Sequence, residues 1–562
     1  MNLFKFNFKY IKDDLFGGIT AGVVALPLAL AFGVQSGMGA EAGLYGAIIL
    51  GFLAAMFGGT STQVSGPTGP MTVVSAVLIA TAVSEYGGLE NAIGVILLTF
   101  LLAGAIQIVL GVLKVGQYIK FIPYPVVSGF MSGIGVIIII LQIFPFFGKA
   151  SPKKITDIIL NIGTALTDIN WFSVIIATLT IGVIYLFPKI TKAIPSTLVA
   201  IIIMPVVTLL LGWEVPKIGD IPRGLPELKI SSFLNFGLGD IPTVLMPAIT
   251  LAALGAIDSL LTSVVADNLT KTRHNSDKEL VGQGIGNMVS SIFGGIPGAG
   301  ATMRTVVNIN AGGKTRISGM VHGLFLLVVL LGLGTLASEI PLSVLAGILI
   351  TVGIGIIDYK GFRHIRSVPK SDSIIMLIVL VATVFVDLLQ AVGIGMVLAT
   401  FLFMKKMSEM SEEHTTVKNL DDYQNENNNG LKWEDEKELT TDFLKKVYIK
   451  HLYGPIFFGF SSSMKNFMGD VEGIDYFVFR FERVPFVDQS GLYALEDIIE
   501  DLKKQGAKIF ITGLNERTEA QLRKIDFMPS LIEEEHVYDD FDDCIMDIKN
   551  EMKKENGILV EG

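Results

Sequence analysis

The 562-residue chain is poor in several residue types, and each shortage excludes a class of protein. Its single cysteine, Cys544, excludes an intramolecular disulfide framework and any metal site built from several cysteines. Only 17% of the residues are charged whereas 51% are hydrophobic, which is unlike an ordinary soluble enzyme. The six histidines are scattered, no complete phosphate-binding glycine loop is present, and no basic patch contains interleaved aromatic residues. The composition therefore argues against catalysis on the chain, a bound cofactor, ATP-driven transport and nucleic-acid binding.

The charge that is present is divided between two parts of the chain. Residues 1–406 hold 25 Lys and Arg against 19 Asp and Glu, a net charge of +6. The remainder, from residue 407, has a net charge of −16. We therefore predict a transmembrane domain over 1–406, a polar linker over 407–442 and a soluble domain over 443–562.

Long apolar runs fill the first part. A membrane-spanning helix needs about 20 apolar residues. We predict fourteen segments, of which 70–84 and 303–310 are short or interrupted: 15–35, 41–57, 70–84, 92–112, 124–147, 171–187, 195–212, 242–267, 279–296, 303–310, 317–337, 341–357, 372–388 and 389–404.

Lysine and arginine residues set the expected orientation. Lys5, Lys9 and Lys12 precede the first segment, and further basic residues gather in alternate loops, although Lys149 falls in a predicted outer loop. An even number of spans returns the chain to the side on which it began. We therefore expect a multi-pass membrane protein with both termini in the cytoplasm.

The segments contain an internal repeat. Five residues recur 236 positions later and four more recur 218 positions later: Leu44, Gly46, Phe57, Gly58 and Gly59 as Leu280, Gly282, Phe293, Gly294 and Gly295, and Ile122, Pro123, Val126 and Gly129 as Ile340, Pro341, Val344 and Gly347. Each half has seven segments, and because seven is odd the halves enter the membrane from opposite sides. This pattern predicts a 7+7 inverted repeat, the architecture of many secondary transporters.

Each half also contains a helix break. The first reads Ser-Gly-Pro-Thr-Gly-Pro over 65–70, and the second reads Gly-Ile-Pro-Gly-Ala-Gly-Ala-Thr over 295–302. Unwound backbone at membrane depth is tolerated where protein or a water-filled cavity satisfies it, and paired breaks mark transporter binding sites. Each following half-helix would aim its positive dipole end at the gap, which favours an anion. The alternative is that these glycines only permit close helix packing.

Few ionisable residues lie inside the segments. Asp258 is in mid-segment, and Thr262 lies four residues later on the same helix face. A carboxylate and a hydroxyl suit a hard cation such as Na⁺, and they suit a proton equally well. Alternatively, Asp258 is a buried carboxylate paired for packing. Arg304 opens the second half-helix, where it could bind an anion, pair with Asp258 or extend to a surface.

These stretches resemble the SulP (sulfate permease) family of anion transporters. The resemblance includes Asp14 to Gly22, the break at Ser65 to Pro70, and Ala301 to Asn308 followed by Gly-Gly-Lys-Thr at 312–315. The pattern from Ala256 to Asp267 is most similar to the BicA-type sodium–bicarbonate symporters of this family. Sulfate-type members often have Gln at the position of Leu28, whereas Arg304 matches the broader family.

The resemblance implies a core and a gate domain, elevator-like movement and usually a homodimer in the lipid bilayer. It implies anion contacts and a Na⁺ site at the following residues: Thr68, Gly69, Ala301, Thr302 and Arg304 for the anion, and Asp258, Thr262, Gly300 and Thr302 for Na⁺. Bicarbonate uptake with Na⁺ is then the leading hypothesis. Sulfate or dicarboxylate transport, coupled to protons or by exchange, and a membrane-tethered regulator are the alternatives.

The acidic tail alternates strands and helices. Strands are expected over 447–458, 476–481 and 508–513, and helices over 491–505, 516–525 and 541–553, which indicates a small α/β domain. The stretch from Val484 to Leu492 resembles the STAS domain signature. In related anti-sigma antagonists the serine that matches Ser490 is phosphorylated, but here Asp488 or Ser490 could simply cap the following helix.

Overall fold

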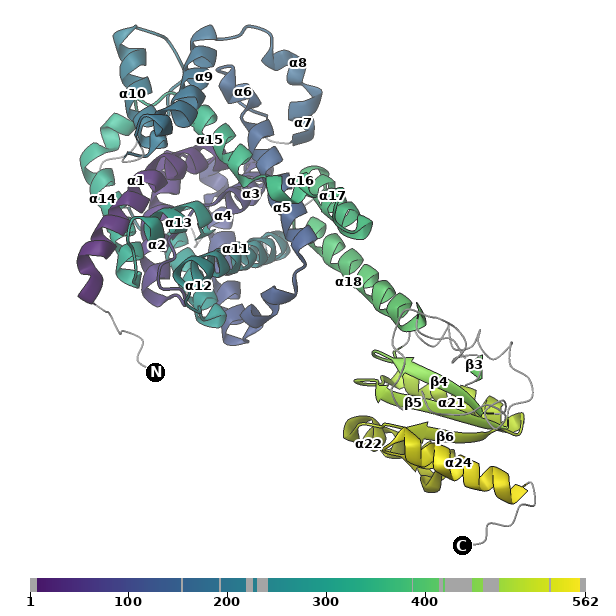
Figure 1. Ribbon diagram of the computed structural model, residues 1–562. Helices are drawn as coiled ribbons and strands as arrows, with labels where there is room; N and C mark the ends of the chain where they lie inside the picture. The colour runs from purple at the N-terminus through teal and green to yellow at the C-terminus, as the bar shows by residue number, and fades with distance from the viewer. Residues whose placement is uncertain are drawn as a thin grey trace. The chain divides into compact units, whose positions relative to one another are not determined.

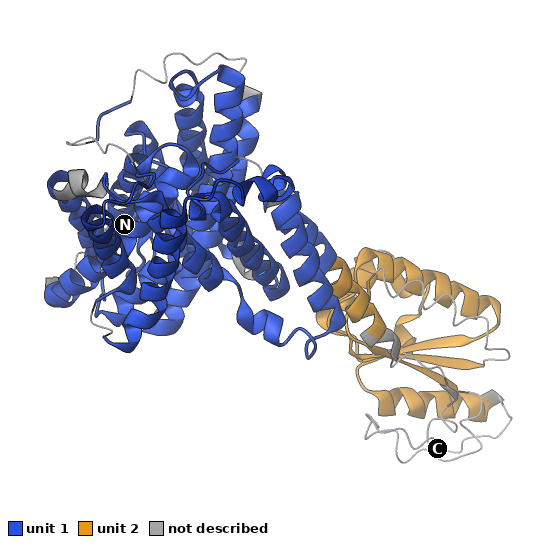
Figure 2. Ribbon diagram, turned by 90° about the horizontal axis from the view of Figure 1, so that it is seen from above, with its two compact units in different colours: residues 1–399 blue, residues 400–562 orange. Residues whose placement is uncertain are grey.

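The computed structural model describes residues 8–152, 155–191, 194–218, 226–229, 241–386, 388–413, 418–419, 447–457, 475–524 and 527–555. The chain forms two compact units, Met1–Ala399 and Thr400–Gly562 (Figure 2). The domain boundary predicted after Lys406 falls inside helix α18 (Leu388–Glu413). Most of the predicted linker, 407–442, lies outside the described residues, so that linker stays a prediction.

Eight helices of the first unit pack into what we call the first bundle. They are α1 (Ile11–Ser36), α2 (Ala40–Phe57), α3 (Gly69–Tyr86), α4 (Leu89–Val112), α11 (Ile241–Thr270), α12 (Ser276–Ile292), α13 (Thr302–Asn310) and α14 (Arg316–Ala337). Helices far apart in the sequence lie side by side here, because α12 packs on α2 and α4 while α14 packs on α1 and α2 (Figure 1). Gly104 and Gly284 allow this approach, since a Cβ on either would lie 2.5–2.7 Å from the carbonyl oxygen of the other.

Five further helices form the second bundle. They are α5 (Tyr124–Leu141), α9 (Trp171–Leu186), α10 (Ser196–Leu210), α15 (Leu342–Ile356) and α17 (Lys370–Phe385). Helix α5 packs on α15 and α17, and α9 packs on α10 and α15. Gly135 and Gly353 form the close contact between α5 and α15, with each absent Cβ only 2.6–2.8 Å from the opposite carbonyl oxygen. Short helices join these elements: α6 (Ile143–Phe146), α7 (Ile155–Leu160), α8 (Ile162–Ala165) and α16 (Tyr359–Arg363).

The helices agree with the predicted segments in place but not always in length. Each of the fourteen segments overlaps a described helix, and the segment 124–147 is divided between α5 and α6. Eight described helices are long and apolar enough to cross a membrane, and three apolar helices are shorter. Helix α13 is short, as expected, whereas α3 has 18 residues and continues beyond the predicted 70–84. The number of spans stays a prediction.

The residues of the sequence repeat lie on helices that correspond in the two halves. The first set begins in α2 and α12 and the second lies at α5 and α15, and each of these pairs packs together. The two halves of the sequence are therefore intertwined in the fold, because each bundle contains helices from the first half and from the second half.

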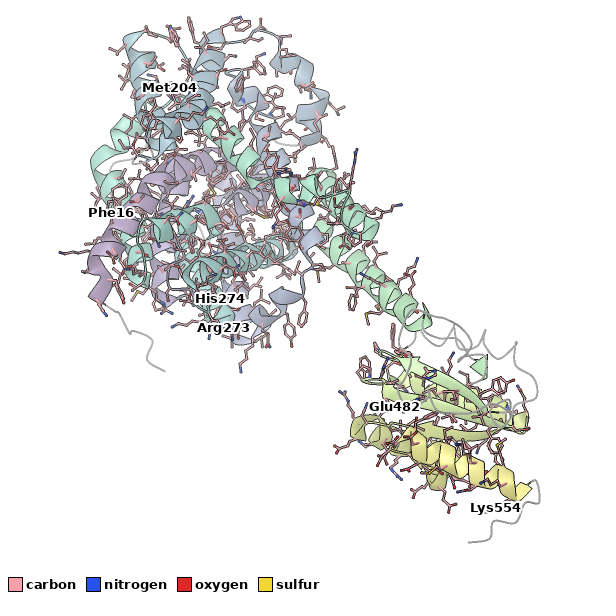
Figure 3. The ribbon with its side chains drawn as sticks, viewed as in Figure 1. Phe16, Met204, Arg273, His274, Glu482 and Lys554 are labelled. Atoms are coloured by element: carbon pink, nitrogen blue, oxygen red, sulfur yellow. The ribbon has the colours of Figure 1, made fainter. Side chains whose placement is uncertain are left out.

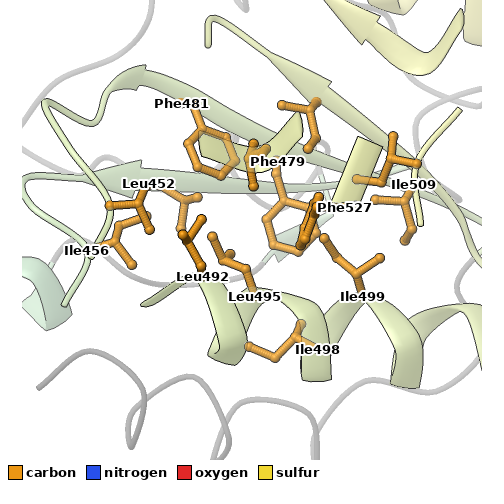
Figure 4. Packing of buried hydrophobic residues seen from close by; sticks show 14 of the residues in the cluster. Leu452, Ile456, Phe479, Phe481, Leu492, Leu495, Ile498, Ile499, Ile509 and Phe527 are labelled. Carbon is orange, nitrogen blue, oxygen red and sulfur yellow. The ribbon is translucent and has the colours of Figure 1, made fainter. Parts of the chain in front are cut away.

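The second unit is an α/β domain. Its sheet has the order β3 (Lys418–Asn419), β4 (Val447–Tyr453), β5 (Tyr476–Arg483), β6 (Lys508–Thr512) and β7 (Val537–Tyr538), in which β4 to β7 are parallel. Helices α21 (Gln489–Lys504) and α22 (Glu516–Lys524) bury apolar side chains with one face of the sheet, and α24 (Phe541–Glu555) covers the other. Figure 4 shows Phe479 and Ile509 packed against Leu495 and Ile499 of α21. The predicted strand–helix alternation is confirmed.

Candidate anion and cation site

The two helix breaks meet in a small antiparallel sheet. Strand β1 (Ser65–Gly66) pairs with β2 (Ala299–Gly300). The backbone N–H of Ala301 extends the pairing by donating to the Val64 carbonyl at 2.9 Å. Helices α3 and α13 begin within three residues of these strands. The pairing therefore brings the starts of both half-helices together.

The starts of the half-helices α3 and α13 are both open at their N-cap residues. Thr68 and Ala301 are the N-cap residues, and neither makes a side-chain capping hydrogen bond. The amides and positive dipole end of each half-helix therefore stay available for an anion. Gly69 lies at the second bundle, since a Cβ there would lie 2.7 Å from Ile138 of α5. The helix starts are thus next to the boundary between the two bundles.

A cluster of oxygen atoms lies beside these starts, where α11 meets β2 and α13. The Thr262 hydroxyl donates to the Gly300 carbonyl at 2.9 Å and lies 2.7 Å from the Thr302 hydroxyl. Because Thr262 has one proton to donate, Thr302 must be the donor to Thr262. The Gly300 N–H donates to Ser259 Oγ at 3.0 Å, which fixes the strand against α11. The structure therefore brings three of the four predicted cation residues into direct contact.

Asp258, the fourth, lies one helical turn before Thr262. It is 7% exposed, and the Thr68 hydroxyl lies beside its carboxyl group. Neither Asp258 Oδ2 nor Thr68 Oγ1 has a hydrogen-bond partner among the described residues. A buried carboxylate oxygen without a donor is costly unless a cation or proton joins it. Asp258 is a predicted cation residue and Thr68 a predicted anion residue, so the two predicted sites adjoin at this contact.

Arg304 lies on the backbone of the first break. Its Nη2 donates to the Pro67 carbonyl at 2.9 Å, and a Cβ at Gly66 would lie 2.4 Å from its Nη1. The side chain is 1% exposed, so extension to a surface is excluded, and the described residues contain no ion pair between Arg304 and Asp258. Its Nε and Nη1 have no hydrogen-bond partner in the described part of the chain. The second half-helix thus places a buried positive charge behind the first break.

Comparison with known proteins decides the family. Residues 11–379 match the sulfate permease family, and residues 438–544 match the STAS domain. The chain belongs to the sulfate permease family. The bicarbonate transporter BicA of Picosynechococcus sp. is 42% identical over 531 residues, which are 93% of this chain and 92% of that protein.

Solved structures agree with this assignment. The transmembrane domain of a cyanobacterium bicarbonate transporter BicA has a TM-score of 0.64 at 47% identity, and the match covers 69% of this chain and 98% of that one. The murine anion transporter Slc26a9 shares the fold, with a TM-score of 0.83 at 18% identity over 97% of this chain and 92% of its own. The predicted family, helical transporter fold and STAS domain are confirmed. This sulfate permease family member is an anion transporter, not an enzyme.

Several polar residues around the site were missed from the sequence. They are buried behind the breaks: Gln63, Ser259, Ser263, Glu279, Gln283 and Asn287. Glu279 is the most important of them. The sequence does not indicate that it is buried, because it follows Asp277 and Lys278 at a helix start, where charged residues are typical of an exposed first turn. Only Gln63 and Gln283 could have indicated these buried residues in advance, since polar side chains in membrane helices usually bind one another.

Asp267, at the end of α11, lies apart from the site. Its Oδ2 accepts from the backbone N–H of His274 at 2.9 Å and lies 2.7 Å from His274 Nδ1. Figure 3 shows His274 and Arg273 in the loop that joins α11 to α12. Asp267 therefore stabilises this loop and provides a comparison for Asp258 on the same helix.

The STAS signature opens α21. Asp488 is the N-cap residue, and its Oδ1 accepts from the Gly491 N–H at 2.7 Å. Ser490 is exposed in the first turn of the helix, so Asp488 rather than Ser490 is the cap. Phosphorylation of Ser490 stays a prediction.

Burial of Lys450 should make the stability of the STAS domain depend on pH. It is fully buried on β4, and desolvation lowers its pKa from 10.5 to about 7. The unfolded chain therefore binds this proton more strongly, and stability should fall as pH decreases from about 10.5 to about 7. The expected slope approaches about 1.4 kcal/mol per pH unit. Lys450→Met should remove it and stabilise the domain at pH 8.

Thiol labelling in urea can measure this slope in the full-length protein. Cys544 is the only cysteine and is buried in the STAS core, where burial raises its pKa to about 12, so only the unfolded domain should react. Lys508→Met, at a half-exposed lysine on β6, should keep the slope. An equal slope in Lys450→Met and the unmodified protein would contradict the prediction.

Proposed function

We propose that this protein imports bicarbonate together with Na⁺. The observation that carries the proposal is the Asp258 carboxylate, whose Oδ2 has no hydrogen-bond partner among the described residues and which adjoins the oxygen cluster of Thr262, Gly300 and Thr302. Carboxylate, carbonyl and hydroxyl oxygens are the ligands that a hard cation prefers. The relatives named as bicarbonate transporters support the choice of anion.

Bicarbonate would bind where the two half-helices begin. We assign its contacts to Thr68, Gly69, Ala301 and Thr302, because uncapped amides and hydroxyls at helix starts suit a small anion. Na⁺ beside Asp258 would satisfy that carboxylate and add positive charge next to the Thr68 hydroxyl. Cation binding would thereby favour anion binding, which is the coupling that a symporter needs.

We infer that the first bundle carries the site across the membrane against the second bundle, as an elevator. Both breaks and α11 belong to the first bundle, and Gly69 adjoins α5 of the second. We further propose a homodimer in the bacterial inner membrane with both termini, and the STAS domain, in the cytoplasm. The basic residues of the predicted inner loops support this orientation.

Uptake into proteoliposomes tests the proposed coupling. Labelled bicarbonate should accumulate faster with an inward Na⁺ gradient than with an equal K⁺ gradient, and an inward proton gradient without Na⁺ should not replace it. Equal uptake in all three conditions, or none, would contradict Na⁺-coupled bicarbonate transport. Liposomes without protein provide the background for the CO₂ that crosses lipid unaided.

Arg304 favours a second candidate, the transport of sulfate or a dicarboxylate by proton coupling or exchange. Within the described part of the chain, two nitrogen atoms of its buried guanidinium have no hydrogen-bond partner, and the group lies behind the break where the anion would bind. A fixed positive charge suits a divalent anion and lessens the need for Na⁺. Competition by sulfate, oxalate or fumarate in the bicarbonate assay distinguishes the candidates. Strong competition that Arg304→Ala removes, with bicarbonate uptake unchanged, would favour the second.

A further inference from the structure

Glu279 is a second carboxylate buried in the first bundle. It is 1% exposed and lies in the first turn of α12. Its Oε2 accepts from the backbone N–H groups of Gly59 and Thr60, both at 2.8 Å. Its Oε1 accepts from the Gln63 and Gln283 amides at 2.9 and 2.8 Å. Four donors therefore satisfy the carboxylate, and no salt bridge to it occurs in the described residues.

One arm of this network reaches the candidate cation site. Glu279 can only accept from Gln63, so it directs the Gln63 carbonyl oxygen the other way, where that oxygen accepts from Ser263 of α11 at 2.9 Å. The Gln63 amide also lies against Gly300, since a Cβ there would lie 2.1 Å from Gln63 Nε2. Gln63 thus supports the strand whose carbonyl binds Thr262.

The other arm reaches the first break. The Gln283 amide that donates to Glu279 also donates to Ser65 Oγ, at 2.6 Å. Ser65 belongs to β1, three residues before the N-cap residue of α3. Glu279 therefore connects the strand beside the cation helix to the strand that precedes the anion-binding helix start.

We propose that Glu279 is a positioning residue of the cation site. It fixes the position of Gly300 through Gln63 and the position of β1 through Gln283. The cation site and the anion-binding helix start thereby keep the distance from each other that coupled transport needs. The inference rests on the proposed Na⁺-coupled function. Partners that orient metal ligands typically alter metal affinity 10–100-fold when replaced.

Glu279→Gln tests the proposal in the full-length protein. The new amide has one acceptor oxygen, and its NH₂ group cannot accept from the two donors that face it. We expect the Na⁺ concentration for half-maximal bicarbonate uptake to rise about 10–100-fold. The maximal rate at saturating Na⁺ should stay within about twofold, whereas a merely structural role would lower the rate and the yield without moving the Na⁺ dependence.

Asp14→Asn is the matched control. Asp14 is equally buried, and it accepts from the backbone N–H groups of Lys314 and Thr315 and from the Thr315 hydroxyl at the start of α14. Its hydrogen bonds reach neither α11 nor the breaks, so the half-maximal Na⁺ concentration should stay at the unmodified value. Na⁺-dependent thermal stabilisation in detergent gives the same comparison if either variant transports poorly.

The outcomes separate the inference from the proposed function. Glu279→Gln that responds to the same Na⁺ concentrations as the unmodified protein, in uptake or in thermal stabilisation, would overturn the positioning role alone. An unmodified protein that does not respond to Na⁺ in either assay would overturn the coupling and the inference with it.

Discussion

Asp258→Asn should abolish Na⁺-dependent bicarbonate uptake, with a loss of at least about 100-fold in the rate at low Na⁺. Removing one member of a buried charge pair costs about 3–5 kcal/mol, which exceeds the 2.8 kcal/mol or so that corresponds to two decades in affinity. The asparagine has nearly the same shape, so the contacts of Thr262, Gly300 and Thr302 should remain. Initial uptake rates against external Na⁺ measure the effect.

Asp267→Asn is the control on the same helix. Asp267 binds His274 in the loop after α11 and does not contact the oxygen cluster, so its replacement should keep the Na⁺ dependence. An Asp258→Asn protein with unchanged Na⁺ dependence would remove Asp258 from the cation site. Transport that continues at all Na⁺ concentrations but loses a pH dependence would instead indicate proton coupling, because asparagine resembles a protonated aspartate.

Gly298→Ala should also abolish transport, because it separates the two breaks. Its Cβ would lie 2.1 Å from the Gly66 carbonyl oxygen, and this contact is with backbone that cannot rotate away. Gly298 cannot move either, since Asn287 binds both its N–H and its carbonyl, at 2.9 and 3.0 Å. We expect uptake below about 1% of the unmodified rate, since a misplacement of about 1 Å can cost 100-fold.

Two further glycine variants show whether the effect is local. Gly66→Ala should be milder, because its Cβ would meet mainly the tip of Arg304, a side chain that can shift. Gly355→Ala, in α15 with no atom within 4 Å of the new Cβ, should transport normally. Uptake is compared at equal amounts of monodisperse protein. Near-normal uptake by Gly298→Ala would show that the close pairing of β1 and β2 is not needed.

Much of this architecture could be predicted because it depends on local properties of the chain. Apolar runs must leave water, so their positions coincide with helices, and Gly and Pro interrupt those helices at residues 65–70 and 295–302. The alternation of strands and helices in the tail follows from the same periodicity rules. Asp258 and Thr262 could be paired in advance because four residues make one helical turn.

The sequence by itself determined which segments are helical, where they break, and that the carboxylate of Asp258 lies in the middle of an apolar segment. Only the tertiary structure decided that the breaks form paired strands, that Arg304 binds the Pro67 carbonyl rather than Asp258, and that Glu279 is buried. The reason is physical. Burial and hydrogen bonding of a polar side chain depend on which segments fold beside it, and Glu279 meets Gly59, Thr60 and Gln63 across 216 to 220 residues of chain.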